Sequence, residues 1–240
     1  MSGVRARSGV GCALPIVAFL LFMLASPAWA EANDNVEVFA GGQVDFANYV
    51  FAGATVALPG STIGNGFALR GLVDVGGYDY IRGDLGPIKA SFSGAELDGV
   101  YQLSLKSFWS DLAVGANDTY TSLSPYDPNN LLRGRQVELR VSLDGGKVAG
   151  PWRADWFGYY GTRLDDYQAR LGLTHALSRQ WRLGAEVDAE GNPNYQLRQV
   201  GPYAGLSLGP RSELQFSAGE AWESGFTPRN YLRANFFRSF

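Results

Sequence analysis

The sequence predicts an all-β protein, a single antiparallel up-and-down transmembrane β-barrel of about twelve strands. Three observations support this fold class. Hydrophobic and polar residues alternate with a period of two from Val36 to Phe240. A segment typical of a secretion signal precedes them, and the chain ends on an aromatic residue where an alternating strand should end. The predicted barrel domain therefore covers residues 31–240.

Residues 1–30 have the pattern of a cleaved signal peptide. Arg5 and Arg7 form the positively charged n-region, Cys12–Ala25 is the apolar stretch, and Ala28-Trp29-Ala30 is the small-residue cleavage site. The apolar stretch is short for a membrane-spanning helix, and no later segment offers about twenty consecutive apolar residues. The chain's only cysteine lies in the part removed, so we expect the mature protein to form no disulfide.

The composition favours one all-β domain without a nucleic-acid partner. Removing Arg5 and Arg7 leaves 18 basic residues of the original 20, against 23 acidic ones, and no basic stripe follows. The chain has 31 Gly, 14 Phe, 12 Tyr and 6 Trp, which suits turns and aromatic-rich strands. We expect no bound cofactor.

Turn-forming residues divide the alternating region into strands. In Gln136–Asp144, hydrophobic residues at odd positions alternate with Glu138, Arg140 and Ser142, and Trp152–Gly161 and Trp181–Glu190 split in the same way. In chain order, the predicted strands span residues 35–44, 47–58, 66–79, 88–103, 108–122, 132–144, 151–162, 166–177, 180–190, 195–208, 212–222 and 229–240.

The predicted connections alternate in character along the chain. Those after even-numbered strands contain Gly, Ser, Pro or Lys, as at Pro59-Gly60-Ser61 and Asp144-Gly145-Gly146. Those after odd-numbered strands are mostly longer, as at 80–87 and 122–131, although the hairpin near Phe46 is short. An even strand number with both termini in the periplasm is the pattern of a single-chain outer-membrane barrel. We expect the protein in the bacterial outer membrane, exported through its signal peptide.

The polar residues favour a barrel in lipid over a soluble sandwich. After residue 30 the sequence has only three lysines, Lys89, Lys106 and Lys147, whereas arginines and carboxylates occupy the middle of strands. Arginine suits fixed, partly desolvated ion pairs, so we interpret the polar face as the lumen. The candidate lumen-lining residues are Glu96, Asp98, Glu138, Arg140, Arg153, Asp155, Phe157, Tyr159, Arg170, Arg182, Glu186 and Asp188.

The opposite face carries Leu, Val, Ala and aromatic residues and is predicted to contact membrane lipid. Trp152, Trp181, Trp222 and Tyr167 lie near strand ends, where interfacial girdles form. In hydrocarbon every backbone polar group must pair within the protein, so such strands require a closed sheet. Arg238 shares the lipid-facing side of the last strand, at the rim, where a charge costs about 0 to 1 kcal/mol.

The sequence predicts no catalytic site. Ser207 lies in a G-x-S-x-G pattern, but no helix and no later histidine follow it. The only histidine, His175, has no hydroxyl beside it on its strand face, unlike the histidine of lipid A deacylase barrels, and a rim position is favoured.

The carboxylates on the predicted strands and loops are better explained by structural roles than by catalysis or metal binding. Glu186, Asp188 and Glu190 share one strand face at steps of about 6.6 Å, a spacing that glycosidases use. Ion pairing with lumen arginines explains them better. Asp127-Pro128-Asn129-Asn130 and Asp165-Asp166 match no EF-hand spacing, so we predict no metal site.

Several strands resemble the BcsS family of cellulose biosynthesis proteins. The resemblance rests on Val38–Asp45 (VFAGGQVD), Tyr49–Leu58 (YVFAGATVAL), Gly66–Tyr78 (GFALRGLVDVGGY) and Gly201–Leu208 (GPYAGLSL), and extends over the whole mature chain. It implies an outer-membrane accessory of cellulose production, with no established enzymatic residues to carry over. A glucan chain and other cellulose-synthesis proteins are the partners it implies.

These observations lead to one principal functional hypothesis and two alternatives. The principal hypothesis is a monomeric, non-enzymatic barrel that assists export or surface assembly of a polysaccharide, with Phe157, Tyr159 and Tyr101 as aromatic surfaces for a neutral glucan. Tyr101 faces either the lumen or lipid, depending on register. The alternatives are a barrel enzyme acting on lipid A or phospholipid, and a surface-binding structural barrel that works through its outer loops.

Overall fold

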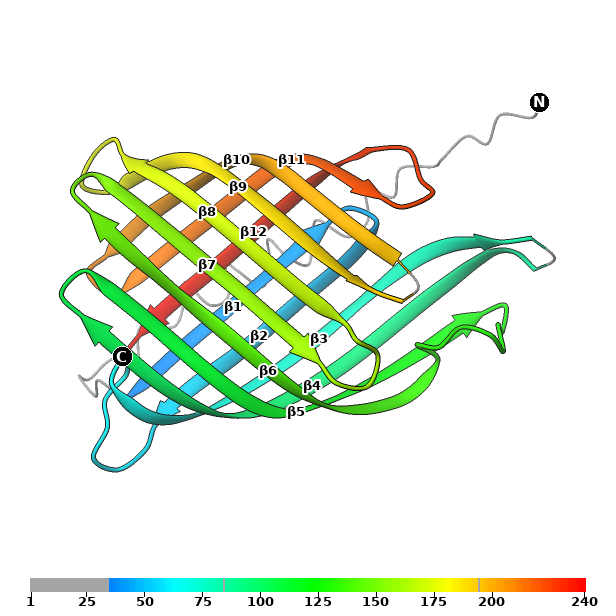
Figure 1. Ribbon diagram of the computed structural model, residues 1–240, viewed down its shortest axis with the longest axis horizontal. Coiled ribbons are helices and arrows are strands. Elements are labelled where there is room, and N and C mark those ends of the chain that lie inside the picture. The colour runs from blue at the N-terminus through cyan, green and yellow to red at the C-terminus, as the bar shows by residue number, and fades with distance from the viewer. Residues whose placement is uncertain (1–34, 84, 194) are drawn as a thin grey trace.

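The computed structural model describes residues 35–83, 85–193 and 195–240, and twelve antiparallel strands of this part of the chain close into one barrel (Figure 1). Each strand pairs with its neighbours in sequence. The predicted signal peptide lies outside the described residues. The strands are β1 Val36–Val44, β2 Ala47–Ala57, β3 Gly66–Arg82, β4 Gly86–Leu105, β5 Phe108–Ser124, β6 Gly134–Ala149, β7 Trp152–Gly161, β8 Tyr167–Ala176, β9 Trp181–Asn192, β10 Tyr195–Gly209, β11 Ser212–Glu223 and β12 Arg229–Ser239.

The first and last strands close the barrel. β1 and β12 pair from Glu37↔Ser239 to Val44↔Leu232, and the backbone N–H of Phe240 donates to the Val36 carbonyl at 2.7 Å. Among the described strands every one therefore has a paired neighbour on both sides, and the sheet has no edge strand. In the described residues no helix has the length and hydrophobicity needed to cross a membrane.

The barrel has two different ends (Figure 1). We call the end that holds the start of β1 and the C-terminus the terminal rim; the connections after even-numbered strands also lie there. The connections after odd-numbered strands lie at the opposite end, the distal rim. The β3–β4 hairpin and the β5–β6 connection project beyond the other strands at the distal rim.

Two predicted connections are wrong in their position. Residues 80–87, predicted as a loop, mostly continue β3 and β4, whose pairing extends to Arg82↔Gly86. Asp144-Gly145-Gly146, predicted as a turn, lies inside β6. These glycines make room for aromatic rings, since a Cβ on Gly145 would lie 2.8 Å from Trp156 Cε2, and the turn to β7 follows after Ala149.

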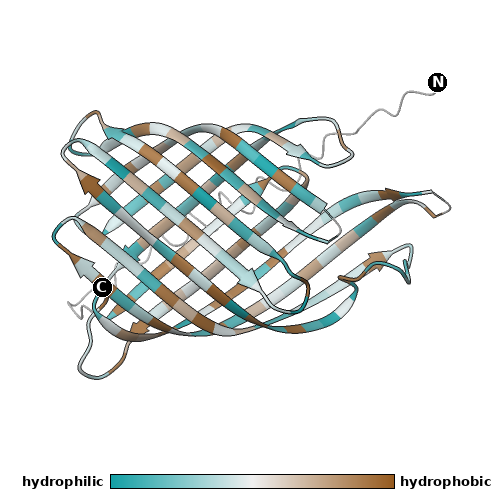
Figure 2. Ribbon diagram, viewed as in Figure 1, coloured by the Kyte–Doolittle hydropathy of each residue, from teal (hydrophilic) through white to brown (hydrophobic). Residues whose placement is uncertain are grey.

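The outer face of the wall is apolar between two aromatic bands. Hydrophobic and hydrophilic residues alternate along the strands (Figure 2), and the large apolar side chains that remain exposed include Leu97, Val114 and Leu139. Exposed aromatics occur near the strand ends, Phe67, Tyr101, Trp152 and Trp181 toward the terminal rim and Tyr120, Tyr160, Tyr167 and Trp222 toward the distal rim. This is the pattern of a transmembrane barrel.

Candidate functional site: the charged lumen

The structure places all twelve candidate lumen residues on the inner face of the wall. Register partners on neighbouring strands point to the same side of the wall. The inner face can therefore be followed through pairs such as Glu96↔Asn117, Asn117↔Glu138 and Arg170↔Asp188. Tyr101 lies on the outer face, where its ring packs against Phe67 at a centroid distance of 5.1 Å. Of the two faces that the sequence left open for Tyr101, the structure shows the lipid-facing one, so Tyr101 offers no surface in the lumen.

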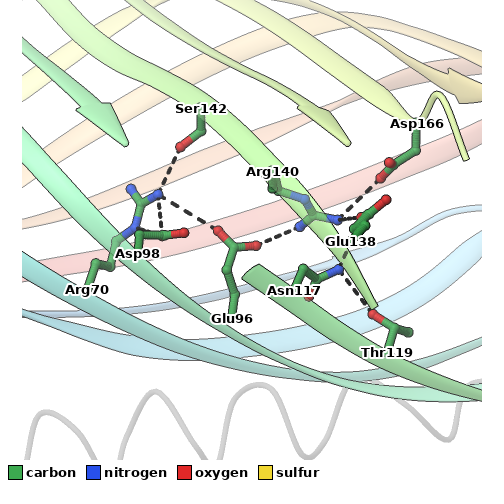
Figure 3. Close-up of polar contacts among 9 residues, drawn as sticks. All are labelled: Arg70, Glu96, Asp98, Asn117, Thr119, Glu138, Arg140, Ser142 and Asp166. Carbon is green, nitrogen blue, oxygen red and sulfur yellow. Dashed lines mark hydrogen bonds and ion pairs between the residues drawn. The ribbon is translucent and has the colours of Figure 1, made fainter. Parts of the chain in front are cut away.

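One polar cluster, the Arg140 network, joins β3, β4, β5, β6 and the β7–β8 connection (Figure 3). Arg140 donates to Glu96 at 2.8 Å, to Glu138 at 3.1 Å and to Asp166 at 3.2 Å. Asn117 also donates to Glu138, at 3.3 Å. The Arg140 side chain therefore links three carboxylates that come from separate parts of the chain.

Arg70 on β3 extends the Arg140 network across the lumen (Figure 3). It donates to Asp98 on β4 at 2.8 Å and to the hydroxyl of Ser142 on β6 at 2.9 Å. Its guanidinium also lies 3.9 Å from Glu96. Because β3 and β6 are not neighbours in the wall, this contact crosses lumen space.

A second cluster, the Arg233 network, centres on an arginine of β12 that is 3% exposed. Arg233 donates to Glu186 at 2.8 Å, to Gln43 at 2.6 Å and to Gln199 at 2.7 Å, and it also binds Asp188. These partners come from β9, β1 and β10. A buried guanidinium requires such a complete set of acceptors, because an unpaired buried charge is very costly.

A third cluster, the Glu213 network, lies nearer the terminal rim. Glu213 on β11 accepts from Arg182 on β9 at 2.6 Å and from Arg153 on β7 at 3.1 Å. Arg153 also donates to Asp155 at 2.6 Å and lies over the Trp109 ring at 4.5 Å. Because β7 and β11 are four positions apart in the wall, Arg153 reaches across the barrel.

These side chains fill much of the lumen. Side chains of ordinary length just fill an eight-stranded barrel, and twelve strands enclose more space. In this barrel, long charged side chains extend into the additional space. Many polar groups of the inner face are almost inaccessible. Those exposed by 9% or less include Gln43, Glu96, Asp98, Gln102, Asn117, Glu138, Glu186, Asp188, Gln199, Gln215, Arg233 and Asn235.

The two predicted aromatic lumen residues are covered by arginines. The Arg140 guanidinium lies 4.3 Å from the Tyr159 ring centroid, and the Arg170 guanidinium lies 5.5 Å from that of Phe157. Cation–π contacts of this kind occupy a face of each ring. Both rings therefore present less surface to a sugar than the sequence suggests.

The inner face of the described strands is acidic overall. Carboxylates outnumber arginines there, which disfavours an anionic polymer in the lumen. The carboxylates are Glu37, Asp74, Glu96, Asp98, Asp111, Glu138, Asp144, Asp155, Glu186, Asp188, Glu190, Glu213 and Glu223, and the arginines are Arg70, Arg82, Arg140, Arg153, Arg170, Arg182, Arg229 and Arg233.

The candidate loop ligands already have protein partners. Arg82 and the Tyr80 hydroxyl donate to Asp127, and the Arg82 bond is the main reason that the pKa of Asp127 falls to about 2. Asp165 accepts from Tyr160, and Asp166 belongs to the Arg140 network. Nowhere in the described chain do three or more His, Cys, Asp or Glu side chains form a group that could hold a metal ion.

The two candidate nucleophile and base residues lie on opposite faces of the wall. His175 points outward and packs on Trp152 at a ring-centroid distance of 4.8 Å. Ser207 lies on the inner face, where it is the register partner of Glu213. Its hydroxyl donates to the Gly209 carbonyl at 2.9 Å. Neither geometry matches a Ser–His pair. Glu186 and Asp188, which have a glycosidase-like spacing, both bind Arg233.

Several residues that organise the lumen were missing from the predicted set. Arg70, Gln43, Gln199, Glu213 and Arg233 each form a contact between separate strands. Their positions in the alternating pattern could have placed them on the inner face. Their contacts depend on which strands face each other across the barrel. The alternation of residues does not give that information.

The closed sheet, the apolar outer face and the charged lumen define a β-barrel of the outer-membrane type. The chain belongs to the BcsS family, because the family model described as cellulose biosynthesis protein BcsS matches residues 37–240. Its members are associated with cellulose biosynthesis, and this association extends to the present protein.

Two solved barrels show the fold at low sequence identity. An outer membrane channel from Pseudomonas putida F1 is 12% identical with a TM-score of 0.55, over 90% of this chain and 100% of that one. The transport unit of the autotransporter AIDA-I from Escherichia coli is 10% identical with a TM-score of 0.54, over 94% and 97%. No curated protein matches the sequence.

Proposed function

We propose that the protein is a non-enzymatic, monomeric outer-membrane accessory that assists export or surface assembly of cellulose, and that it acts in assembly rather than as an open conduit. The observation that carries this choice is the filled lumen. Arg70, Arg153 and Arg233 each bind groups on strands that are not their neighbours. A glucan chain could pass only if several of these contacts broke together.

The distal rim is the part of the protein that best suits a surface role. With both termini in the periplasm, as in other single-chain barrels, the distal rim faces the outside of the cell. Asp127 and Tyr80 tie the β5–β6 connection to the β3–β4 hairpin there. Asn130 donates to the Tyr80 hydroxyl at 2.9 Å, so several hydrogen bonds link the two projecting elements.

Cellulose output tests the proposed role. A strain lacking the protein is expected to deposit severalfold less cellulose at its surface, and the wild-type gene should restore it. Surface cellulose should fall without accumulation of glucan in the periplasm. Accumulation there would favour export over assembly, and unchanged cellulose with altered lipid A or phospholipid would support the enzymatic alternative instead.

Planar-bilayer recording tests the closed lumen. The wild-type barrel is expected to show no stable conductance, because the Arg140, Arg233 and Glu213 networks obstruct the lumen. Removing the charges of Arg153 and Glu213 together should raise conductance, and the acidic inner face should make it cation-selective. A large steady conductance of the wild-type protein would contradict the closed-lumen proposal.

A further inference from the structure

A cleft of about 690 Å³ lies at the distal rim, beside the end of β5. β5 pairs with β6 only as far as Thr121↔Gly134, although β5 continues to Ser124. The β5–β6 and β7–β8 connections enclose the space next to this unpaired edge. The lining residues that matter here are Tyr120, Tyr126, Leu131, Arg133, Arg163 and Leu164.

The cleft has two arginines and no carboxylate among its lining residues. Arg163 is exposed and has no hydrogen bond or ion pair with the described residues. Arg133 is held in place, since it donates to the Tyr126 hydroxyl at 3.2 Å and to the Asn130 carbonyl at 3.0 Å. One guanidinium is therefore positioned and the other is available to an added anion.

The acidic groups on the same elements are already bound, Asp127 by Arg82 and Asp166 by Arg140. Asp118 on the outer face of β5 accepts from Arg135 at 2.6 Å, and Asp165 in the β7–β8 connection accepts from Tyr160. Arg135, the register partner of Tyr120, is neutralised by Asp118, so the uncompensated charge at the cleft comes from Arg133 and Arg163. The charge around the cleft thus suits an anion.

The position of the cleft indicates which anion it would meet. Tyr120 belongs to the distal aromatic band on the outer face, which marks the membrane interface. Leu131 and Leu164 supply an apolar lining beside the arginines. A ligand that combines phosphate, which guanidinium groups bind well, with a sugar that packs on the tyrosine rings and with acyl chains at the membrane surface fits this lining.

We propose that this cleft binds the phosphorylated sugar headgroup of an outer-leaflet glycolipid of the lipid A class. The assignment rests on the proposed outer-membrane placement, with the distal rim outward. Arg163 and Arg133 contact the phosphate, and the tyrosines and leucines contact the sugar and the first acyl carbons. The barrel is thereby anchored to the lipid around the rim where cellulose is assembled.

Native mass spectrometry of the purified barrel in detergent, titrated with bisphosphorylated lipid A, tests this site. Arg163→Gln should weaken lipid A binding about fivefold, and the Arg133→Gln/Arg163→Gln pair about thirtyfold. Arg179→Gln, in the β8–β9 connection at the terminal rim, is the matched control and should bind as the wild type does. If the double variant fails to fold, Arg163→Gln alone still tests the site. Arg163 makes no hydrogen bond or ion pair with the described residues, so its replacement should leave the fold intact.

Three further ligands complete the titration. Lipid A stripped of its phosphates should bind as weakly as the double variant binds intact lipid A. Equal binding of the stripped lipid, preferential binding of inorganic phosphate, or binding of cello-oligosaccharides in place of lipid A would each overturn the assignment. If lipid A fails to bind while the gene still raises cellulose output, this site is wrong and the proposed function stands.

Discussion

Replacing Arg233 with alanine is expected to lower the free energy of unfolding by about 3 to 5 kcal/mol. Arg233 is almost fully buried and is the only cation that binds both Glu186 and Asp188 within 3 Å among the described residues. Without it, both buried carboxylates lose their closest cation, and the side-chain oxygens of Gln43 and Gln199 lose a hydrogen-bond donor. Urea unfolding in detergent micelles, followed by tryptophan fluorescence, measures the change.

Arg135 is the matched control for the Arg233 substitution. It also pairs with a carboxylate, Asp118, at 2.6 Å, but its side chain is 72% exposed. Exposed pairs contribute about 0.2 to 1 kcal/mol, so Arg135→Ala should have a small effect. If the Arg233 and Arg135 variants lost the same small amount of stability, the lumen networks would not hold the barrel together.

Replacing Val114 with arginine is the second substitution with a large expected effect. Val114 lies on the outer face of β5, is 54% exposed and pairs with Val141. Midway between the aromatic bands it should contact acyl chains, and an arginine at the bilayer midplane costs about 2 to 4 kcal/mol. Equilibrium unfolding in liposomes compares this variant with the wild type.

The control for Val114 uses the same strand, the same face and the same new residue. Ser122 lies on the outer face of β5 near the distal rim, where an added arginine should cost about 0 to 1 kcal/mol. The difference between Val114→Arg and Ser122→Arg therefore reports depth in lipid. Equal costs at the two positions would mean that the outer face does not contact hydrocarbon.

The alternation of residues was enough to predict the barrel and the inner position of the twelve candidate lumen residues, but not the face of Tyr101. It predicted the inner position of Arg153 and Glu186 because a period of two assigns faces directly. The same rule failed at Asp144-Gly145-Gly146, since glycines that accommodate Trp156 resemble a turn in composition. It also failed at residues 80–87, where the paired hairpin is polar because it projects beyond the barrel.

The contacts across the lumen could not be predicted from the sequence. Arg153 meets Glu213, and Arg70 meets Ser142, only because of the tilt and stagger of strands that are not neighbours in the wall. A period of two gives the face of a residue but neither its height nor its position around the barrel. The identity of the lumen residues was therefore accessible, whereas the networks they form were not.

The central claim is that the apolar sides of these strands contact acyl chains while their charged sides meet inside a closed wall. The most direct measurement is the gel migration of the purified mature chain with and without boiling, after folding into detergent. We predict that the unboiled protein migrates as a separate, compact band and needs detergent to stay in solution. Identical migration of both samples, with full solubility in detergent-free buffer, would contradict the claim.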